Sequence, residues 1–150
     1  MIETGGGSVI HMGSNSWWQA AGDFPAYRTA KAAMHGLTCT MARDLGGHRI
    51  RINTVVSGWI MTERQKELWV TPETLVKQID RQCEPDAIDP VYVAQMVLFL
   101  ASEIQRHAQR ITSWWKVAQS KQDRTNKNKF LNCCRQLVQK HQIFISIFSI

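Results

Sequence analysis

The chain has 150 residues, of which 44% are hydrophobic, so it is long enough for one domain with a moderate core. Its net charge of +6 is uneven: residues 1–120 carry 12 basic and 11 acidic residues, whereas residues 121–150 carry 6 and 1. A nearly neutral body argues against a nucleic-acid-binding protein, which would present a basic surface. The apolar end IFISIFSI is much shorter than the roughly 20 residues of a membrane-spanning helix.

The four cysteines form no CxxC pair and no Cys/His spacing suited to zinc, so no metal site is expected. Their use is typical of a reduced compartment, and nothing at the start resembles a signal peptide. These features predict a cytoplasmic protein that interacts with neither membrane nor nucleic acid.

Three elements are predicted in the first 58 residues. A glycine turn and a short apolar strand lie within 5–13. Residues 25–47 form a helix, with Pro25 in its first turn and a glycine pair as its stop signal. Its apolar stripe would consist of Ala30, Met34, Leu37, Met41 and Leu45. The β-branched run at 49–58 predicts a second strand.

Two further helices are predicted where an N-cap residue precedes proline, at Thr71 and at Asp89. The second helix would bury Val93, Met96, Val97 and Leu100. Strand, helix and strand in this order predict a βαβ unit, in which a right-handed crossover joins two parallel strands. The fold class is therefore α/β.

Polar side chains gather at the carboxyl ends of the two strands, where ligands bind in open parallel sheets. Ser14 follows the first strand, and Ser57 and Gly58 follow the second. Tyr27 and Lys31 lie one helical turn apart near the start of the connecting helix, so they share one face. We expect these groups to converge on one cleft.

These residue types suit proton transfer to or from an alcohol. A free phenol has a pKa of about 10, but a nearby lysine ammonium favours its ionised form. A serine hydroxyl can hold the substrate oxygen beside the tyrosine while a hydride leaves or joins its carbon. For Tyr27 and Lys31 alone, a solvent-facing helix pair would be the simpler interpretation, but Ser14 and the segment NTVVSG favour the catalytic one.

The stretch GSNSWWQAAGDFPAYRTAK resembles the short-chain dehydrogenase/reductase family. Tyr27 and Lys31 match its YxxxK motif, Ser14 matches its catalytic serine, and RINTVVSGWIMT is similar to its RVNxVxPGxxxT segment. The resemblance covers about residues 5–103.

The resemblance implies a role for each matched residue and a cofactor, NAD or NADP. Tyr27 would be the acid/base, Ser14 would orient the substrate, and Lys31 would activate Tyr27 and bind the nicotinamide ribose with it. The segment from Gly58, with the backbone of Ile60 and the hydroxyl of Thr62, would contact the nicotinamide amide.

The resemblance also implies a partial Rossmann-like doubly wound parallel sheet, with residues 1–103 as the C-terminal half of the catalytic domain. The family's TGxxxGxG loop and catalytic asparagine have no counterpart here, and the glycines at 5–7 are better interpreted as the turn before the strand. Ser57 replaces the usual proline. Residues 104–150 are an atypical basic tail that resembles a frameshifted or disordered segment and should not form the family's last strand.

Residues 61–103 are similar to sugar 1-dehydrogenases, which oxidise aldoses to lactones. That similarity implies a small alcohol, carbonyl or sugar substrate and a homo-oligomeric intact family member. Trp17, Trp18 and Trp69 would then line a sugar pocket, although mere packing explains the first two equally well. A non-catalytic fragment or interaction module remains the alternative function. His11 is expected to be a satisfied sheet histidine and His35 a helix-surface one.

Overall fold

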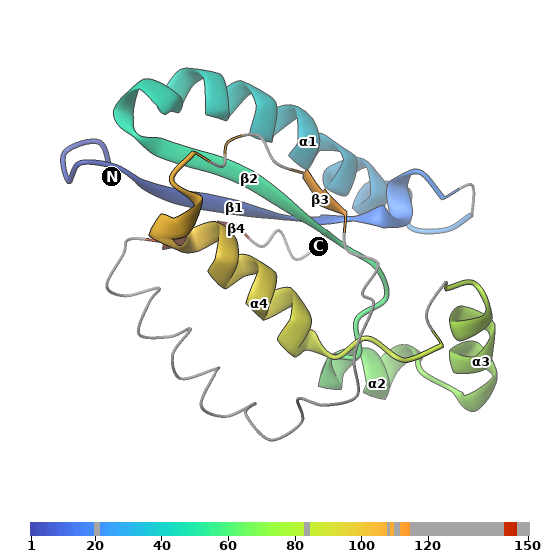
Figure 1. Ribbon diagram of the computed structural model, residues 1–150. Coiled ribbons are helices and arrows are strands. Elements are labelled where there is room, and N and C mark those ends of the chain that lie inside the picture. The colour runs from blue at the N-terminus through green and yellow to red at the C-terminus, as the bar shows by residue number, and fades with distance from the viewer. Residues whose placement is uncertain (20–21, 83–84, 108, 110–111, 115–142, 147–150) are drawn as a thin grey trace.

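The structure is a computed structural model that describes residues 1–19, 22–82, 85–107, 109, 112–114 and 143–146 (Figure 1). All statements below concern these residues. The elements are β1 (Gly7–Ser14), η1 (Asn15–Trp17), α1 (Pro25–Leu45), η2 (Gly46–His48), β2 (Ile50–Ser57), α2 (Glu63–Trp69), α3 (Pro72–Asp80), α4 (Pro90–Ala101), η3 (Glu103–Gln105), β3 (Thr112–Trp114) and β4 (Ile143–Ser146).

The strands form one parallel sheet in the order β3-β2-β1-β4. β1 and β2 pair along their whole length, from Gly7 opposite Ile50 to Ser14 opposite Ser57. The α1 helix connects these two strands and covers one face of the sheet, while α4 lies on the other face (Figure 1). The predicted α/β class with a partial parallel sheet is thereby confirmed.

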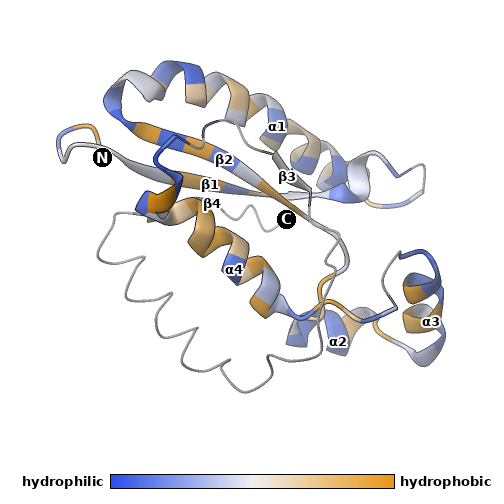
Figure 2. Ribbon diagram, viewed as in Figure 1, coloured by the Kyte–Doolittle hydropathy of each residue, from blue (hydrophilic) through white to orange (hydrophobic). Residues whose placement is uncertain are grey.

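Alternate residues of the strands supply two hydrophobic clusters, one on each face. Ile10 and Val55 pack against Leu100 and Ala101 of α4, with Met12, Val93, Met96 and Val97 at the margin. Figure 2 shows how strongly hydrophobic residues dominate α4. On the other face Val9, Ile50 and Ile52 pack against Ala42 of α1, with Met1, Met41 and Leu45 around them. The stripe predicted for α4 is therefore confirmed.

The stripe predicted for α1 is only partly correct. The buried residues of this helix are Lys31, Met34, Thr38 and Ala42, whereas Leu37 is 39% exposed. The physical reason is that the facing sheet surface is itself partly polar. His11 and Thr54 provide hydrogen-bond partners there, so that a threonine is buried where an all-apolar stripe would place a leucine.

This polar layer is a chain of three side chains between the sheet and α1. The Nδ1 atom of His11 lies 2.7 Å from the Thr38 hydroxyl, which lies 2.5 Å from the Thr54 hydroxyl. All three residues are at least 98% buried. Burial lowers the pKa of the His11 imidazole below its usual value. His11 is thus the satisfied sheet histidine that was predicted.

The described part of the predicted tail includes two short strands. Residues 112–114 pair parallel with β2, at the edge where a further strand of the sheet belongs, and residues 143–146 pair parallel with β1. The Gln109 side chain accepts a hydrogen bond from the Ile52 amide at 2.8 Å and donates one to the Ala42 carbonyl at 3.0 Å. Parts of the predicted tail thus join the sheet, and the prediction that residues 104–150 do not form the family's last strand stays a prediction; the remainder of the tail lies outside the described residues.

The described helices include none that is long and apolar enough to cross a membrane.

The α2 helix was not predicted, because its sequence ERQKELW has no apolar stripe. Its start is set by Thr62, whose side chain accepts a hydrogen bond from the Gln65 amide at 3.1 Å.

We predict that His11 makes folding stability depend on pH. Because burial lowers its pKa in the folded state, the unfolded chain binds more protons below about pH 6.5. Stability is therefore fully present above the unfolded pKa and falls as the pH decreases, by at most about 1.4 kcal/mol per pH unit for one proton. Urea unfolding at pH 7.5, 6.5 and 5.5 measures this loss.

The matched variant is His11→Asn, which keeps a polar group facing Thr38 but cannot titrate. It should show a flatter dependence of unfolding free energy on pH, on a lower overall stability. Equal pH slopes in the two proteins would contradict the assignment.

Candidate active site at the carboxyl edge of the sheet

The two central strands end side by side. Ser14 and Ser57 are the last residues of β1 and β2 and stand opposite each other in the register. Gly58 follows at once, and a β-carbon placed on it would lie 3.4 Å from Nδ2 of Asn15. The loops after β1 and β2 therefore meet at one edge, as predicted from the sequence.

The first turns of α1 bring Tyr27 and Lys31 to this edge. The helix begins at Pro25, after Phe24 has turned the chain through a left-handed conformation (φ 52°). The Lys31 ammonium lies 5.5 Å from the centre of the Tyr27 ring. That geometry allows a cation–π attraction of about 0.5–1 kcal/mol or more.

Lys31 is also tied to the end of β1. Its Nζ atom donates a 2.9 Å hydrogen bond to the carbonyl of Met12, two residues before Ser14. The side chain is 94% buried, and burial lowers the pKa of its ammonium. A buried ammonium requires partners, and the carbonyl and the ring face supply two of them. This lysine therefore fixes the helix face that carries Tyr27 against the strand that carries Ser14.

Ser14 is buried and held by its own neighbourhood. Its hydroxyl accepts a 3.2 Å hydrogen bond from the Ser16 amide and donates a 3.0 Å bond to the Ser16 hydroxyl. The spacing of Ser16 to Tyr27 does not match that of a catalytic serine, so no catalytic role is assigned to Ser16. A serine that follows another by two residues at a strand end is, however, typical of a local side-chain turn, and that signal could have identified it.

The loop after β2 carries the residues expected to face the nicotinamide. Ile60 forms a parallel bridge with Ile88, and the Met61 amide donates to the Ile88 carbonyl at 2.9 Å. The Thr62 amide donates to the Ile60 carbonyl at 2.9 Å. The Thr62 hydroxyl caps α2 as an acceptor, which leaves its O–H group as a donor within the described contacts.

Aromatic side chains connect the start of α1 with the end of α2 at this edge of the sheet. Trp69, at the end of α2, packs edge-on against Phe24, three residues before Tyr27, with ring centres 5.8 Å apart. Trp17 packs against Trp18 at 4.7 Å and donates a 3.2 Å hydrogen bond from its indole to Nε2 of His35. His35 thus takes part in an aromatic cluster instead of being a plain surface residue. Sequence patterns gave no sign of the contact between Phe24 and Trp69.

The glycines at 5–7 lie at the opposite end of β1. The turn before the strand is closed by hydrogen bonds from the Gly5 amide to the Ile2 carbonyl (3.3 Å) and from the Gly6 amide to the Met1 carbonyl (3.0 Å). This segment is the turn before the strand that was predicted, and it does not face Ser14.

Comparison with known proteins agrees with this geometry. The family model described as enoyl-(acyl carrier protein) reductase matches residues 1–112. Over 103 residues the chain is 46% identical to D-xylose 1-dehydrogenase of Caulobacter vibrioides and 39% identical to a probable galactose dehydrogenase of Rhizobium meliloti. Each match covers 69% of this chain, which spans 41% and 40% of those two proteins.

Solved structures show the same arrangement of elements. A short-chain type dehydrogenase/reductase from Mycobacterium ulcerans matches with a TM-score of 0.70 at 25% identity, over 75% of this chain and 41% of that one. A 3-oxoacyl-[acyl-carrier protein] reductase from Brucella melitensis matches with a TM-score of 0.69 at 26% identity, over 75% and 41%. From its sequence, its sheet and these relatives, the chain belongs to the short-chain dehydrogenase/reductase family.

Proposed function

We propose that this chain carries the proton-transfer site of an NAD- or NADP-dependent oxidoreductase that interconverts an alcohol and a carbonyl compound. The observation that carries the proposal is the placement of Lys31, whose buried ammonium contacts both the Tyr27 ring and the Met12 carbonyl of β1, two residues before Ser14. Burying an ammonium is costly unless it is hydrogen-bonded, so a lysine at this position supports a role that a neutral side chain would not fulfil.

Each of the three residues has one task in this proposal. Tyr27 removes the hydroxyl proton when the substrate is oxidised and returns it in reduction. Lys31 places its positive charge against the Tyr27 ring, and its hydrogen bond to the Met12 carbonyl holds the ammonium there. Ser14 directs its hydroxyl at the substrate oxygen and exchanges its present bond to Ser16 for one to the substrate.

The chain's residues fit the nicotinamide end of the cofactor, which supplies the hydride acceptor when bound. Lys31 and Tyr27 offer donors to the ribose, and the Thr62 hydroxyl and the backbone at Ile60 offer polar groups to the amide. The absence of a side chain at Gly58 leaves room at the end of β2, since a β-carbon at this position would contact the Asn15 side chain. We assign no preference between NAD and NADP.

An aldose that is oxidised to a lactone is the proposed substrate class. The relatives named D-xylose 1-dehydrogenase and galactose dehydrogenase support this choice. Aromatic faces are suited to the C–H surfaces of a sugar ring, and Phe24 and Trp69, both more than half exposed, present such faces next to the turn that carries Tyr27.

A second candidate is a non-catalytic interaction module. It is favoured by exposed apolar side chains on several elements, among which Leu68, Val76 and Ile104 are 56%, 59% and 85% exposed. Such groups are typical of surfaces that meet another chain. A hydride-transfer assay on the purified chain separates the two functions.

We predict that Tyr27→Phe removes hydride transfer from the purified chain. D-xylose and D-galactose are supplied with NAD or NADP, and reduced cofactor is followed by its absorbance. The substitution removes the transferable proton and leaves the ring that faces Lys31, so turnover should fall by about 10²–10⁴-fold while the fold is retained. Turnover equal to that of the unaltered chain would assign the acid/base to another residue, and no turnover in either protein would favour the interaction module.

We also predict different effects for two serines of the same turn. Ser14→Ala should lower turnover by about 10²-fold or more, because the substrate oxygen loses the donor that orients it. Ser16→Ala removes a hydroxyl at 3.0 Å from Ser14 but no group that faces the substrate, so it should cost less than about tenfold. Equal losses in the two variants would show that the turn as a whole matters and not the Ser14 hydroxyl.

A further inference from the structure

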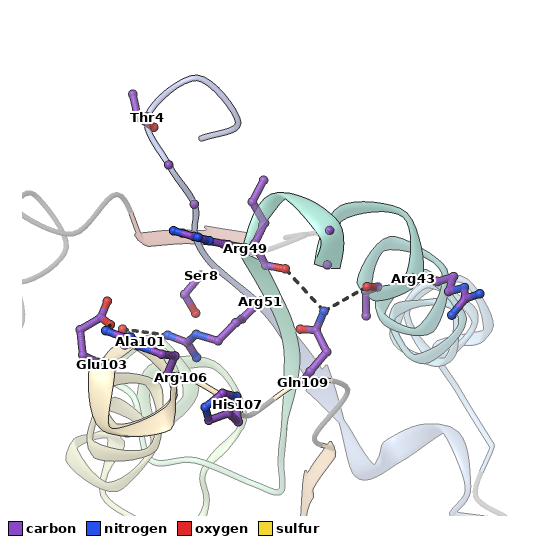
Figure 3. A pocket seen from close by; sticks show the side chains of 17 residues that line it. Thr4, Ser8, Arg43, Arg49, Arg51, Ala101, Glu103, Arg106, His107 and Gln109 are labelled. Atoms are coloured by element: carbon purple, nitrogen blue, oxygen red, sulfur yellow. Dashed lines mark hydrogen bonds and ion pairs between the residues drawn. The ribbon is translucent and has the colours of Figure 1, made fainter.

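An open cavity of about 1050 Å³ lies at the amino end of the sheet, opposite the candidate active site. Its walls come from the turn before β1, the start of β2, the end of α1 and the segment after α4 (Figure 3). Nothing proposed above for hydride transfer uses this cavity, so an inference about it stands independently of the proposed function.

The cavity is lined by an unusual concentration of positive charge. Four arginines line it, Arg43, Arg49, Arg51 and Arg106, against one carboxylate, Glu103, and His107 adds a titratable ring. The first 120 residues as a whole are almost neutral, with 12 basic and 11 acidic residues. A third of those basic residues therefore meets at one cavity, which gives it a local charge that the composition does not predict.

Arg51 is built into the wall. Its guanidinium donates hydrogen bonds to the carbonyls of Leu100 (2.6 Å), Ala101 (3.2 Å) and Ser102 (3.3 Å), which close the end of α4. These backbone carbonyls carry no formal charge, and the nearby Glu103 carboxylate favours the charged form of the guanidinium. Arg51 thus provides a fixed positive charge at the cavity wall.

Arg49 is held at the rim by its backbone. Its amide donates to the Gly46 carbonyl at 3.0 Å, its carbonyl accepts from the Gly7 amide at 3.2 Å, and its φ of 58° is left-handed. A β-carbon on Gly6 would lie 2.6 Å from the Arg49 carbonyl oxygen, so the glycine turn allows this close approach. The Arg49 side chain is exposed and makes no described hydrogen bond or ion pair.

The two remaining arginines, Arg106 and Arg43, lie at different places around the cavity. Figure 3 shows Arg106 and Glu103 beside Arg51, whereas Arg43 lies on the far side of Gln109. Arg106 pairs with Glu103 at 3.4 Å, but both side chains are more than 70% exposed, so this pair is weak and easily exchanged. Arg49, Arg51 and Arg106 therefore form the part of the lining that a single ligand can contact.

We propose that this cavity binds a small multivalent oxyanion, a molecule with two or more phosphate or carboxylate groups. Arginine forks match both groups with paired hydrogen bonds. Arg49 precedes β2, Arg51 lies within it and Arg106 follows η3, and this spread favours an anion with charge at more than one point. The cavity is also much larger than one phosphate needs.

The test is calorimetric titration of the purified full chain with tripolyphosphate and, separately, with citrate, at constant ionic strength. Saturable binding near one equivalent is expected. Tripolyphosphate alone would identify phosphate as the recognised group, citrate alone would identify carboxylate, and both would show that charge and its spacing suffice. Failure of both to saturate overturns the proposal.

Three variants locate the binding. Arg49→Gln and Arg106→Gln should each weaken it by about threefold or more, because each removes a charged donor at an exposed site. Arg64→Gln removes the same charge from an exposed position of α2, away from the cavity, and should leave affinity unchanged. Binding to the basic segment 121–150 would be insensitive to Arg49 and Arg106, so equal affinities in all variants overturn the assignment. Arg106 is exposed and its loss spares the core, so this variant remains decisive if Arg49→Gln unfolds.

Discussion

The parallel pairing of β1 with β2 is the constraint on which the rest of the structure depends. It places Ser14 opposite Ser57 at one edge and Gly7 opposite Ile50 at the other. Since both strands run the same way, the connecting helix must return from the carboxyl edge of one to the amino edge of the other. Its first turns therefore stand beside the ends of the strands, where Lys31 contacts the Met12 carbonyl and the Tyr27 ring.

In this arrangement the sheet buries polar side chains where it packs against α1. His11, Thr38 and Thr54 satisfy one another in the layer under α1, and Lys31 finds a carbonyl and a ring face in the same layer. An apolar residue at His11, Thr38 or Thr54 would leave a buried polar group without its partner. An apolar residue in place of Lys31 would remove the charge next to Tyr27. The hydrogen-bonded layer thus tolerates a buried ammonium, because its neighbours already present oxygen atoms toward α1.

Much of the fold could be predicted from local patterns. Glycine turns, proline at the first helical position and β-branched runs identified β1, α1, β2, α3 and α4, because each signal acts within a few residues. The polar face of α1 could not be predicted, since the burial of Thr38 depends on a strand residue 27 positions away in sequence. The contact between Phe24 and Trp69, which joins the two halves of the candidate site, has the same cause. For the candidate site, the spacing of residues in the sequence indicated which residues belong to it. It did not indicate the hydrogen bonds that Ser16 makes with Ser14 and that the Met12 carbonyl accepts from Lys31.

The α1 helix also separates the two ends of the sheet electrostatically. It presents Lys31 to the candidate active site and Ala42 to the basic cavity, and the helical segment between these two residues spans about 16 Å. That length is about twice the distance over which charges are screened at physiological ionic strength, roughly 8 Å. Salt screening over this length weakens the influence of the cavity arginines on the ammonium beside Tyr27, although the buried Lys31 is screened less than an exposed charge would be. Coupling between the basic cavity and the candidate active site would have to pass through the packing of α1 on the sheet. The buried polar layer fixes α1 in position on the sheet between these two sites.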